Sequence, residues 1–195
     1  MKTKIISVII LLQFAIVAAW AQTYTADAAK STLNWKAEKL TGFHEGTIAI
    51  KSGTFKIEKD KVTSGKFVIS MSTIVDTDLT DAEYNKKLIG HLSSPDFFDV
   101  TKFPEAIFTI TQPVDVSKSV AEVHGNLTLK GVSKPLTFKA VVKKEGTSYT
   151  FSANSIVVDR TVYGIKYGSG SFFSDLGDKV IYDEFTIKLK LVMNQ

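Results

Sequence analysis

The sequence contains no cysteine, and this absence excludes several kinds of chemistry. Without thiols, the 195-residue chain has no disulfide, no thiol nucleophile and no thiolate metal site. Arginine is almost absent as well, because Arg160 is the only arginine among 24 basic residues. The stability of the fold must therefore come from packing and from closure of its secondary structure.

Motifs for catalysis and for cofactor binding are also missing. The three histidines, His44, His91 and His124, are far apart in the sequence and show no metal-ligand spacing. No Gly-x-Ser-x-Gly, Walker or complete dinucleotide motif occurs. The aspartates that flank Phe97-Phe98 favour a turn over an acid–base pair. The sequence therefore predicts no catalytic residue, no metal and no cofactor.

The charge of the chain is small and spread out. The formal net charge is +4, and the two lysines of the first 21 residues account for half of it. The longest basic runs are only Lys86-Lys87 and Lys143-Lys144. Nucleic-acid binding requires a concentrated basic face, so we expect no nucleic-acid partner.

The N-terminal segment 1–21 has the pattern of a secretory signal peptide. A basic start is followed by the apolar segment 5–17 and by the small-x-small site Ala19-Trp20-Ala21. The apolar segment is too short for a good transmembrane helix. We therefore expect cleavage after Ala21 and export to the periplasm or beyond a bacterial cell, with one domain over residues 22–195.

Most of the remaining chain alternates between apolar and polar residues, which is typical of strands with one buried face. In the segment 125–135 the apolar residues occupy odd positions up to Leu129 and even positions from Val132 onward. This change of parity predicts a hairpin with Lys130-Gly131 as a two-residue turn. About eight such strands predict an all-β protein, an antiparallel up-and-down barrel or a sandwich.

One short helix is expected from Asp81 to Ile89. Thr80 and Glu83 have the spacing of a capping box, and Gly90 fits the residue that ends a helix.

The inward parity selects a set of large apolar residues for the interior, and phenylalanine occurs 13 times. Periodicity alone cannot distinguish a packed core from a lined cavity. The residues expected to line the interior are Trp35, Ile50, Phe55, Phe67, Ile69, Phe108, Ile110, Leu127, Phe138, Phe151, Phe185 and Leu189.

Four segments resemble motifs of the YceI-like family, in the order in which the family has them. They are Gly125–Pro135 (GNLTLKGVSKP), His91–Asp99 (HLSSPDFFD), Phe103–Phe108 (FPEAIF) and Arg160–Gly164 (RTVYG). The chain departs from the family in the segment before His91 and in the glycine-rich loop after Gly164, both of which are candidate regions for head-group or lid contacts.

The resemblance implies a lipocalin-like, eight-stranded barrel with one short helix, exported to the periplasm or secreted. It implies a non-enzymatic protein that holds a long amphiphilic lipid, such as a polyprenyl chain, an isoprenoid quinone or a fatty-acid derivative. The sequence leaves open transient membrane contact and a homodimer as further associations.

Polar residues near the expected barrel mouth are His44, His91, Arg160 and Tyr163. Arg160 either binds an anionic head group or, as we favour, fixes the following loop through a salt bridge.

Two alternative functions remain. A hydrolase or isomerase that acts on such a lipid would use His44, His91, Asp96 or Arg160, whereas a ligand-free structural or stress-related surface module would have a solid interior.

Overall fold

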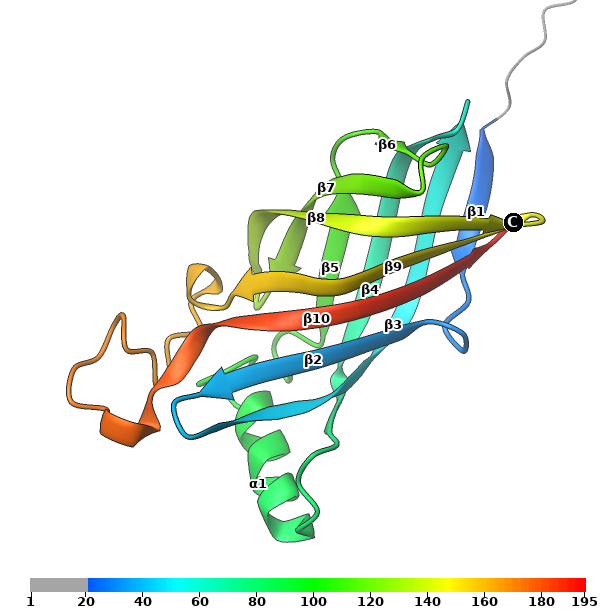
Figure 1. Ribbon diagram of the computed structural model, residues 1–195. Helices are drawn as coiled ribbons and strands as arrows, with labels where there is room; N and C mark the ends of the chain where they lie inside the picture. Colours follow the sequence, from blue (N-terminus) through cyan, green and yellow to red (C-terminus); the bar gives the residue numbers. More distant parts are fainter. Residues whose placement is uncertain (1–20) are drawn as a thin grey trace, which may run out of the picture.

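The chain forms a closed antiparallel β-barrel in which consecutive long strands pair with each other (Figure 1). The computed structural model describes residues 21–195, so the predicted signal peptide, except for Ala21, lies outside the described residues. Pairing of the last strand with the first long strand closes the barrel. The barrel strands are β2 (Thr32–Lys39), β3 (Gly42–Glu58), β4 (Lys61–Asp76), β5 (Glu105–Ile110), β7 (Val120–Leu129), β8 (Val132–Glu145), β9 (Ser148–Asp159) and β10 (Ile181–Asn194).

This topology confirms the predicted all-β, eight-stranded up-and-down barrel with one helix. Among the described residues, no helix is both long and apolar enough to cross a membrane.

Two short strands that alternation does not reveal are added at one end of the barrel. Strand β1 (Gln22–Ala26) pairs with the end of β3 and with the end of β10. Strand β6 (Val114–Asp115) pairs with the first two residues of β4. Segments of five and two residues are too short for a period of two to emerge, so only the tertiary pairing defines them.

The predicted hairpin between β7 and β8 is present in the predicted register. Leu129 lies opposite Val132, and the two turn residues Lys130 and Gly131 have φ angles of 49° and 76°. Positive φ at both positions is the geometry of a type I′ turn, whose twist matches that of the flanking strands. The apolar residues on both sides of the turn consequently share the inner face of the barrel.

Helix α1 (Ala82–Ser93) begins and ends later than the sequence predicted. Its N-cap is Asp81, whose carboxylate accepts hydrogen bonds from the backbone N–H groups of Glu83 and Tyr84, so the predicted capping box at Thr80 is wrong. Gly90 does not end the helix. The helix continues to Ser93 because Leu92 is buried in the barrel core, and this packing outweighs the low helix propensity of glycine.

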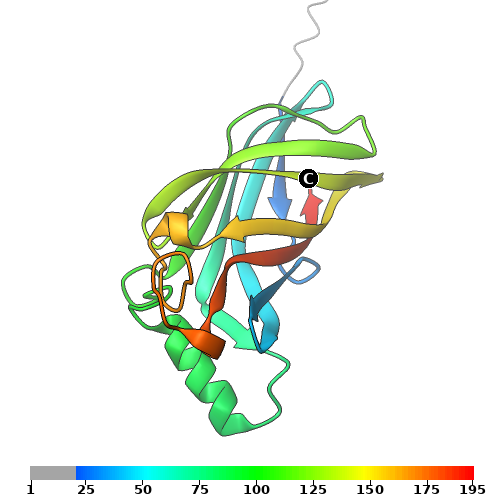
Figure 2. The same cartoon turned by 60° about the vertical axis from the view of Figure 1, so that its left-hand side comes forward.

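The two ends of the barrel differ in what covers them, as Figures 1 and 2 show. We call the end that carries β1, β6 and the C-terminus the floor. The opposite end, which we call the mouth, carries helix α1, the β2–β3 hairpin and the long β9–β10 connection. That connection contains two short 3-10 helices, η1 (Thr161–Tyr163) and η2 (Gly177–Lys179).

Candidate functional site

The interior of the barrel contains an apolar cavity of about 220 Å³ that runs from the floor to the mouth. Its wall includes Phe55, Val62 and Val114 from the floor as well as Leu92 and Phe97 from the mouth. An apolar cavity of about 150 Å³ already suffices to bind benzene, so this space is large enough for a ligand. The barrel is therefore hollow, and we call the cavity the tunnel.

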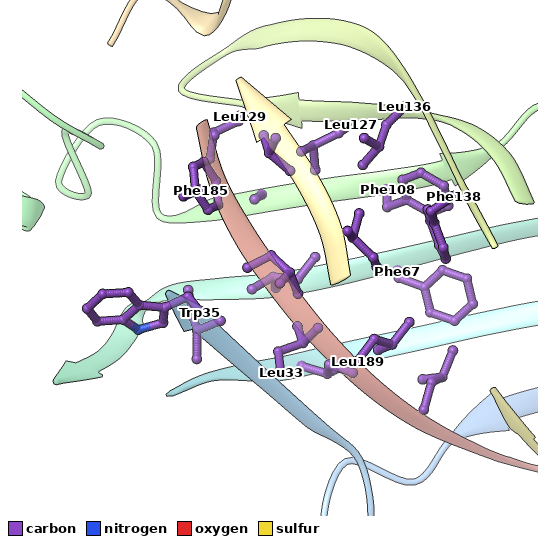
Figure 3. Close-up of a pocket in the computed structure, with 18 of the residues that line it drawn as sticks. Leu33, Trp35, Phe67, Phe108, Leu127, Leu129, Leu136, Phe138, Phe185 and Leu189 are labelled. Atoms are coloured by element: carbon purple, nitrogen blue, oxygen red, sulfur yellow. The ribbon is translucent and has the colours of Figure 1, made fainter. Parts of the chain in front are cut away.

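All twelve residues that the sequence selected for the interior lie on the wall of the tunnel. Figure 3 shows several of them, including Trp35, Phe67, Phe108 and Phe185, with their side chains directed into the barrel. They come from all eight strands of the barrel, and they share the inner face because the alternation of each strand continues around the closed sheet.

The tunnel wall also contains residues outside the predicted set of twelve. Leu33, Leu136 and Leu191 continue the inward parity of their strands and could have been found by extending the pattern. Phe97 and Phe98 follow helix α1 in a turn, where no periodicity exists, so only the tertiary structure places them at the tunnel.

Aromatic packing closes the tunnel at the floor. The Tyr24 ring lies 5.2 Å from the Phe55 ring and 5.3 Å from the Tyr149 ring, and Phe55 meets Phe151 edge to face at 5.6 Å. These rings are almost completely buried. Edge-to-face contacts between rings stabilise such a cluster beyond its apolar burial. Phe55 thus belongs both to the tunnel wall and to a packed cluster that closes its end.

The tunnel reaches the surface at the mouth. Tyr182 lines it and is 45% exposed, whereas Val62 and Val114 at the floor are at most 2% exposed. Phe98, Ile181 and Phe185 are partly exposed wall residues in the same region. A long molecule would consequently enter at the mouth and extend toward the floor.

Of the described residues, Arg160 is the only charged one on the tunnel wall, and just 3% of its surface is exposed. Its Nε donates to the Tyr182 carbonyl at 3.1 Å, and its terminal nitrogens donate to the carbonyls of Ile165 at 2.9 Å and Ile181 at 3.0 Å. Burial lowers the pKa of the guanidinium, although the charge of Asp183 acts in the opposite direction. The guanidinium thus fixes the β9–β10 connection.

The structure contains the predicted salt bridge of Arg160 and adds closer partners. The terminal nitrogen Nη2 lies 3.7 Å from Asp183 Oδ1. Three carbonyl groups are the closer partners because the chain curls around the guanidinium in this region. A guanidinium has five N–H donors, so donors remain beyond those three bonds.

The remaining mouth candidates lie in different surroundings. Tyr163 is buried in the core near the mouth, where burial raises the pKa of its hydroxyl. His91, in the last turn of helix α1, packs edge to face on Phe97 and Tyr167, with ring centroids 5.0 and 4.4 Å away. His91 thereby connects the helix with the β9–β10 connection.

His44 lies elsewhere on the rim, at the start of β3, where its Nδ1 is 3.1 Å from Asp78 Oδ2. Within residues 21–195, no hydrogen bond joins any two of the side chains that the enzyme hypothesis invoked, namely His44, His91, Asp96 and Arg160. In the described chain these four side chains therefore form no hydrogen-bonded group, although His91 and Arg160 both lie against the Phe97 ring.

Known proteins share both the sequence pattern and the barrel. A UPF0312 protein from Pseudomonas putida strain W619 is 36% identical over 115 residues, which are 58% of this chain and 57% of that protein. The match thus spans little more than half of the relative's length. BcnA from Burkholderia cenocepacia is similar in structure, with a TM-score of 0.65, 26% identity and coverage of 86% of this chain and 98% of BcnA.

A polyisoprenoid binding domain from Saccharophagus degradans has the same fold, with a TM-score of 0.63. It is 18% identical, and the superposition covers 88% of this chain and 97% of that domain. Residues 24–193 match the family described as the YceI-like domain, which includes every strand of the closed barrel. The hollow barrel, the hairpin of segment 125–135 and this match together show that the chain belongs to the YceI-like family.

Proposed function

We propose that this protein is an exported binding or carrier protein that holds one long amphiphilic lipid, a polyisoprenoid, an isoprenoid quinone or a fatty-acid derivative, without transforming it. The tunnel carries the proposal, because it is apolar along its length, closed at the floor and accessible at the mouth. A molecule that fits must be long and apolar with its polar group at one end. The polyisoprenoid binding domain of similar fold supports the same ligand class.

Hydrophobic transfer provides enough free energy for such binding. Each buried CH₂ group contributes about 0.8 kcal/mol, so a five-carbon isoprene unit contributes on the order of 3–4 kcal/mol. A few units outweigh the loss of ligand freedom. Selectivity would then depend on chain length and width, because the wall offers almost no hydrogen-bonding groups to the chain.

The head group is proposed to lie beside Arg160. Among the described residues no other charged side chain lines the tunnel, and Arg160 is bonded to the carbonyl of Tyr182, a wall residue that is half-exposed at the mouth. The donors of the guanidinium beyond its three carbonyl bonds suit a phosphate, carboxylate or carbonyl oxygen. This arrangement favours a ligand whose polar end is a hydrogen-bond acceptor.

Ligand exchange is proposed to occur at a membrane surface. Within residues 21–195 the six exposed aromatic side chains all lie at the mouth: Phe43, Tyr84, Tyr167, Phe172, Phe173 and Tyr182. Aromatic rings partition into the interface of a bilayer, which would bring the tunnel entrance to the lipid.

Export is tested separately. N-terminal sequencing of the exported protein should show that the mature chain begins at Gln22.

Native mass spectrometry of the purified mature protein tests the lipid hypothesis. We expect a bound mass that solvent extraction releases chemically unchanged. Leu127→Trp adds bulk inside the tunnel and should abolish the bound mass, whereas Val141→Trp adds the same bulk on the exposed outer face and should keep it. A wild-type protein that stays ligand-free and takes up no polyprenyl or fatty-acid probe contradicts the proposal, and a modified lipid would support the enzyme alternative.

Fluorescence provides a second measurement, because Trp35 is the only tryptophan in the chain from Gln22 onward and lies on the tunnel wall. A lipid with a brominated chain should quench the fluorescence of Trp35 in the wild type and in the outer-face variant Val141→Ser, because both keep the tunnel open. Equal quenching by a short brominated alcohol would show that chain length does not matter.

A further inference from the structure

A second cluster of functional groups lies on the rim of the mouth, outside the apolar tunnel wall. It consists of His44 on β3, Asp76 at the end of β4 and Asp78 in the connection to helix α1. One nitrogen or oxygen from each side chain lies within 4.8 Å of the others. His44 Nδ1 is 3.1 Å from Asp78 Oδ2 and 3.8 Å from Asp76 Oδ2. The fold thus brings His44 to two aspartates that lie more than 30 positions later in the sequence, and the three metal-ligating groups face one point.

The pairing of β3 with β4 creates this cluster. Gly46 lies opposite Asp76, and a Cβ atom at Gly46 would collide with the Val75 carbonyl. Only glycine permits this close approach, in which the Trp35 indole lies over Gly46 and donates a 3.1 Å hydrogen bond to the same carbonyl. His44, two residues before Gly46, then shares its face of the sheet.

Each carboxylate is oriented by hydrogen bonds to its Oδ1 atom. Asp76 Oδ1 accepts hydrogen bonds from the backbone N–H of Leu79 at 2.9 Å and from Asn85 Nδ2 at 3.1 Å. Asp78 Oδ1 accepts from the backbone N–H of Glu45 at 2.8 Å. The Oδ2 atom of each faces the cluster. The Oδ1 contacts orient the groups as outer-shell contacts orient metal ligands.

Asp76 Oδ2 has no hydrogen-bond partner although its side chain is fully buried. A buried carboxylate oxygen without a partner is unfavourable, and burial together with the neighbouring Asp78 raises the pKa of Asp76. His44 leaves this oxygen unsatisfied, because its Nδ1 is within hydrogen-bond distance of Asp78 and not of Asp76. The site lacks one positively charged partner that contacts both carboxylates.

We propose that His44, Asp76 and Asp78 bind a divalent transition-metal ion of the zinc type. An imidazole with two carboxylates is a donor set that Zn²⁺ accepts, with metal–ligand distances of about 2.0–2.2 Å and an open fourth position. Tetrahedral ligands at those distances lie about 3.4 Å apart, so side-chain shifts of less than about 1 Å would complete the site.

The ion would join three parts of the mouth rim. His44 belongs to β3, Asp76 ends β4, and Asp78 lies in the connection from β4 to helix α1; Figure 1 labels these elements. Binding would therefore hold the start of this connection on β3, directly behind Trp35 of the tunnel wall. This role is independent of any lipid, so the site can be tested whether or not the tunnel is filled.

Zinc affinity is measured on untagged mature protein by competition with a chromophoric chelator at pH 7.5. We expect one Zn²⁺ per chain. Loss of an outer-shell contact weakens metal affinity about 10–100-fold, so loss of a direct ligand in Asp76→Asn or His44→Gln should weaken it at least about 100-fold. His124→Gln is the matched control, because His124 also lies beside a carboxylate, Glu122, at 3.3 Å on the exposed surface. Its affinity should equal that of the wild type.

Thermal unfolding supplies a readout that does not depend on the chelator. Zn²⁺ should raise the unfolding midpoint of the wild type and of His124→Gln, and leave Asp76→Asn and His44→Gln unchanged, because a ligand stabilises only the form that binds it. A folded wild type that binds no Zn²⁺ overturns the proposal. Equal affinity in the wild type and Asp76→Asn overturns it as well, and His44→Gln decides if Asp76→Asn fails to fold.

Discussion

The floor and the mouth of the barrel are built from different kinds of residues. At the floor, Tyr24, Phe55 and Tyr149 pack ring against ring and are at most 2% exposed. At the mouth lie all three buried polar or charged residues of the described chain, Asp76, Arg160 and Ser169, together with every exposed aromatic side chain. One end is closed by apolar packing, and the other combines buried charge with exposed rings.

This difference shows where stability and function reside in one barrel. Apolar packing at the floor requires no special partners and stabilises the fold through burial. Buried charge at the mouth needs particular partners, which Arg160 finds in three carbonyl groups and Asp76 finds only in part. Departures from simple packing rules concentrate at functional sites, and in the part of the chain that the structure describes the buried polar and charged residues lie at the mouth.

The largest effect is expected from an alteration of the floor. Phe55→Ala removes a ring from the cluster with Tyr24 and Phe151 and should lower the free energy of unfolding by about 3–5 kcal/mol, measured by urea denaturation. Phe173→Ala removes the same ring from the exposed mouth and should change stability by less than about 0.5 kcal/mol. Similar losses in both variants would show that the two ends do not differ in packing.

Removal of the charge at the mouth should have the next largest effect. Arg160→Met leaves the carbonyls of Ile165, Ile181 and Tyr182 without their donor and should cost about 2–4 kcal/mol. Hydrogen exchange should accelerate in residues 161–182 while the floor stays protected. Lys166→Met removes an exposed cation from the same connection and serves as the control. Faster hydrogen exchange at the floor in Arg160→Met would mean that the two ends do not open independently of each other.

A smaller effect that depends on pH is expected at Asp76. Burial and Asp78 raise the pKa of Asp76, so the folded protein holds this proton more tightly than the unfolded chain does. The contribution of this group to stability is present below its unfolded pKa and is lost as pH rises through the folded pKa. In the presence of a chelator, Asp76→Asn should therefore be more stable than the wild type at pH 7.

That advantage of Asp76→Asn should shrink as the pH falls through the raised pKa of Asp76, because Asp76 itself becomes protonated there. Thermal unfolding of both proteins between pH 4 and 7 measures it. Asp78→Asn is the contrasting variant, because hydrogen bonds from the Glu45 backbone, Asp76 and His44 outweigh the effect of burial and lower the pKa of Asp78. Its removal should destabilise the protein at pH 7, and identical pH profiles for the two variants would contradict this assignment.

The smallest effect on stability, with a clear effect on association, is expected from the exposed rings of the mouth. Replacement of both Phe172 and Phe173 by serine should leave the free energy of unfolding within about 0.5 kcal/mol and reduce flotation with lipid vesicles. Val120→Ser with Val141→Ser removes exposed apolar side chains from β7 and β8 as a control. Loss of flotation in the control pair alone would place the contact surface on the barrel wall instead.

Much of the barrel could be predicted because alternation is a local property. The hairpin around Lys130-Gly131 and the twelve interior residues follow from parity within single strands. The helix boundaries were less predictable, since Thr80 and Asp81 are both capable caps and only the hydrogen bonds of the folded chain select Asp81. Gly90 was misjudged for a related reason, because the burial of Leu92 extends the helix past it.

The sequence alone determined that the chain forms an antiparallel sheet with one apolar face, and which residues lie on that face. Both follow from the alternation of apolar and polar residues within each strand. The tertiary structure decided that the sheet closes around a hollow space, with a packed floor and an open mouth. It also brought His44 to Asp76 and Asp78. Such meetings depend on the register between strands, and register is a relation between distant segments that no single segment specifies.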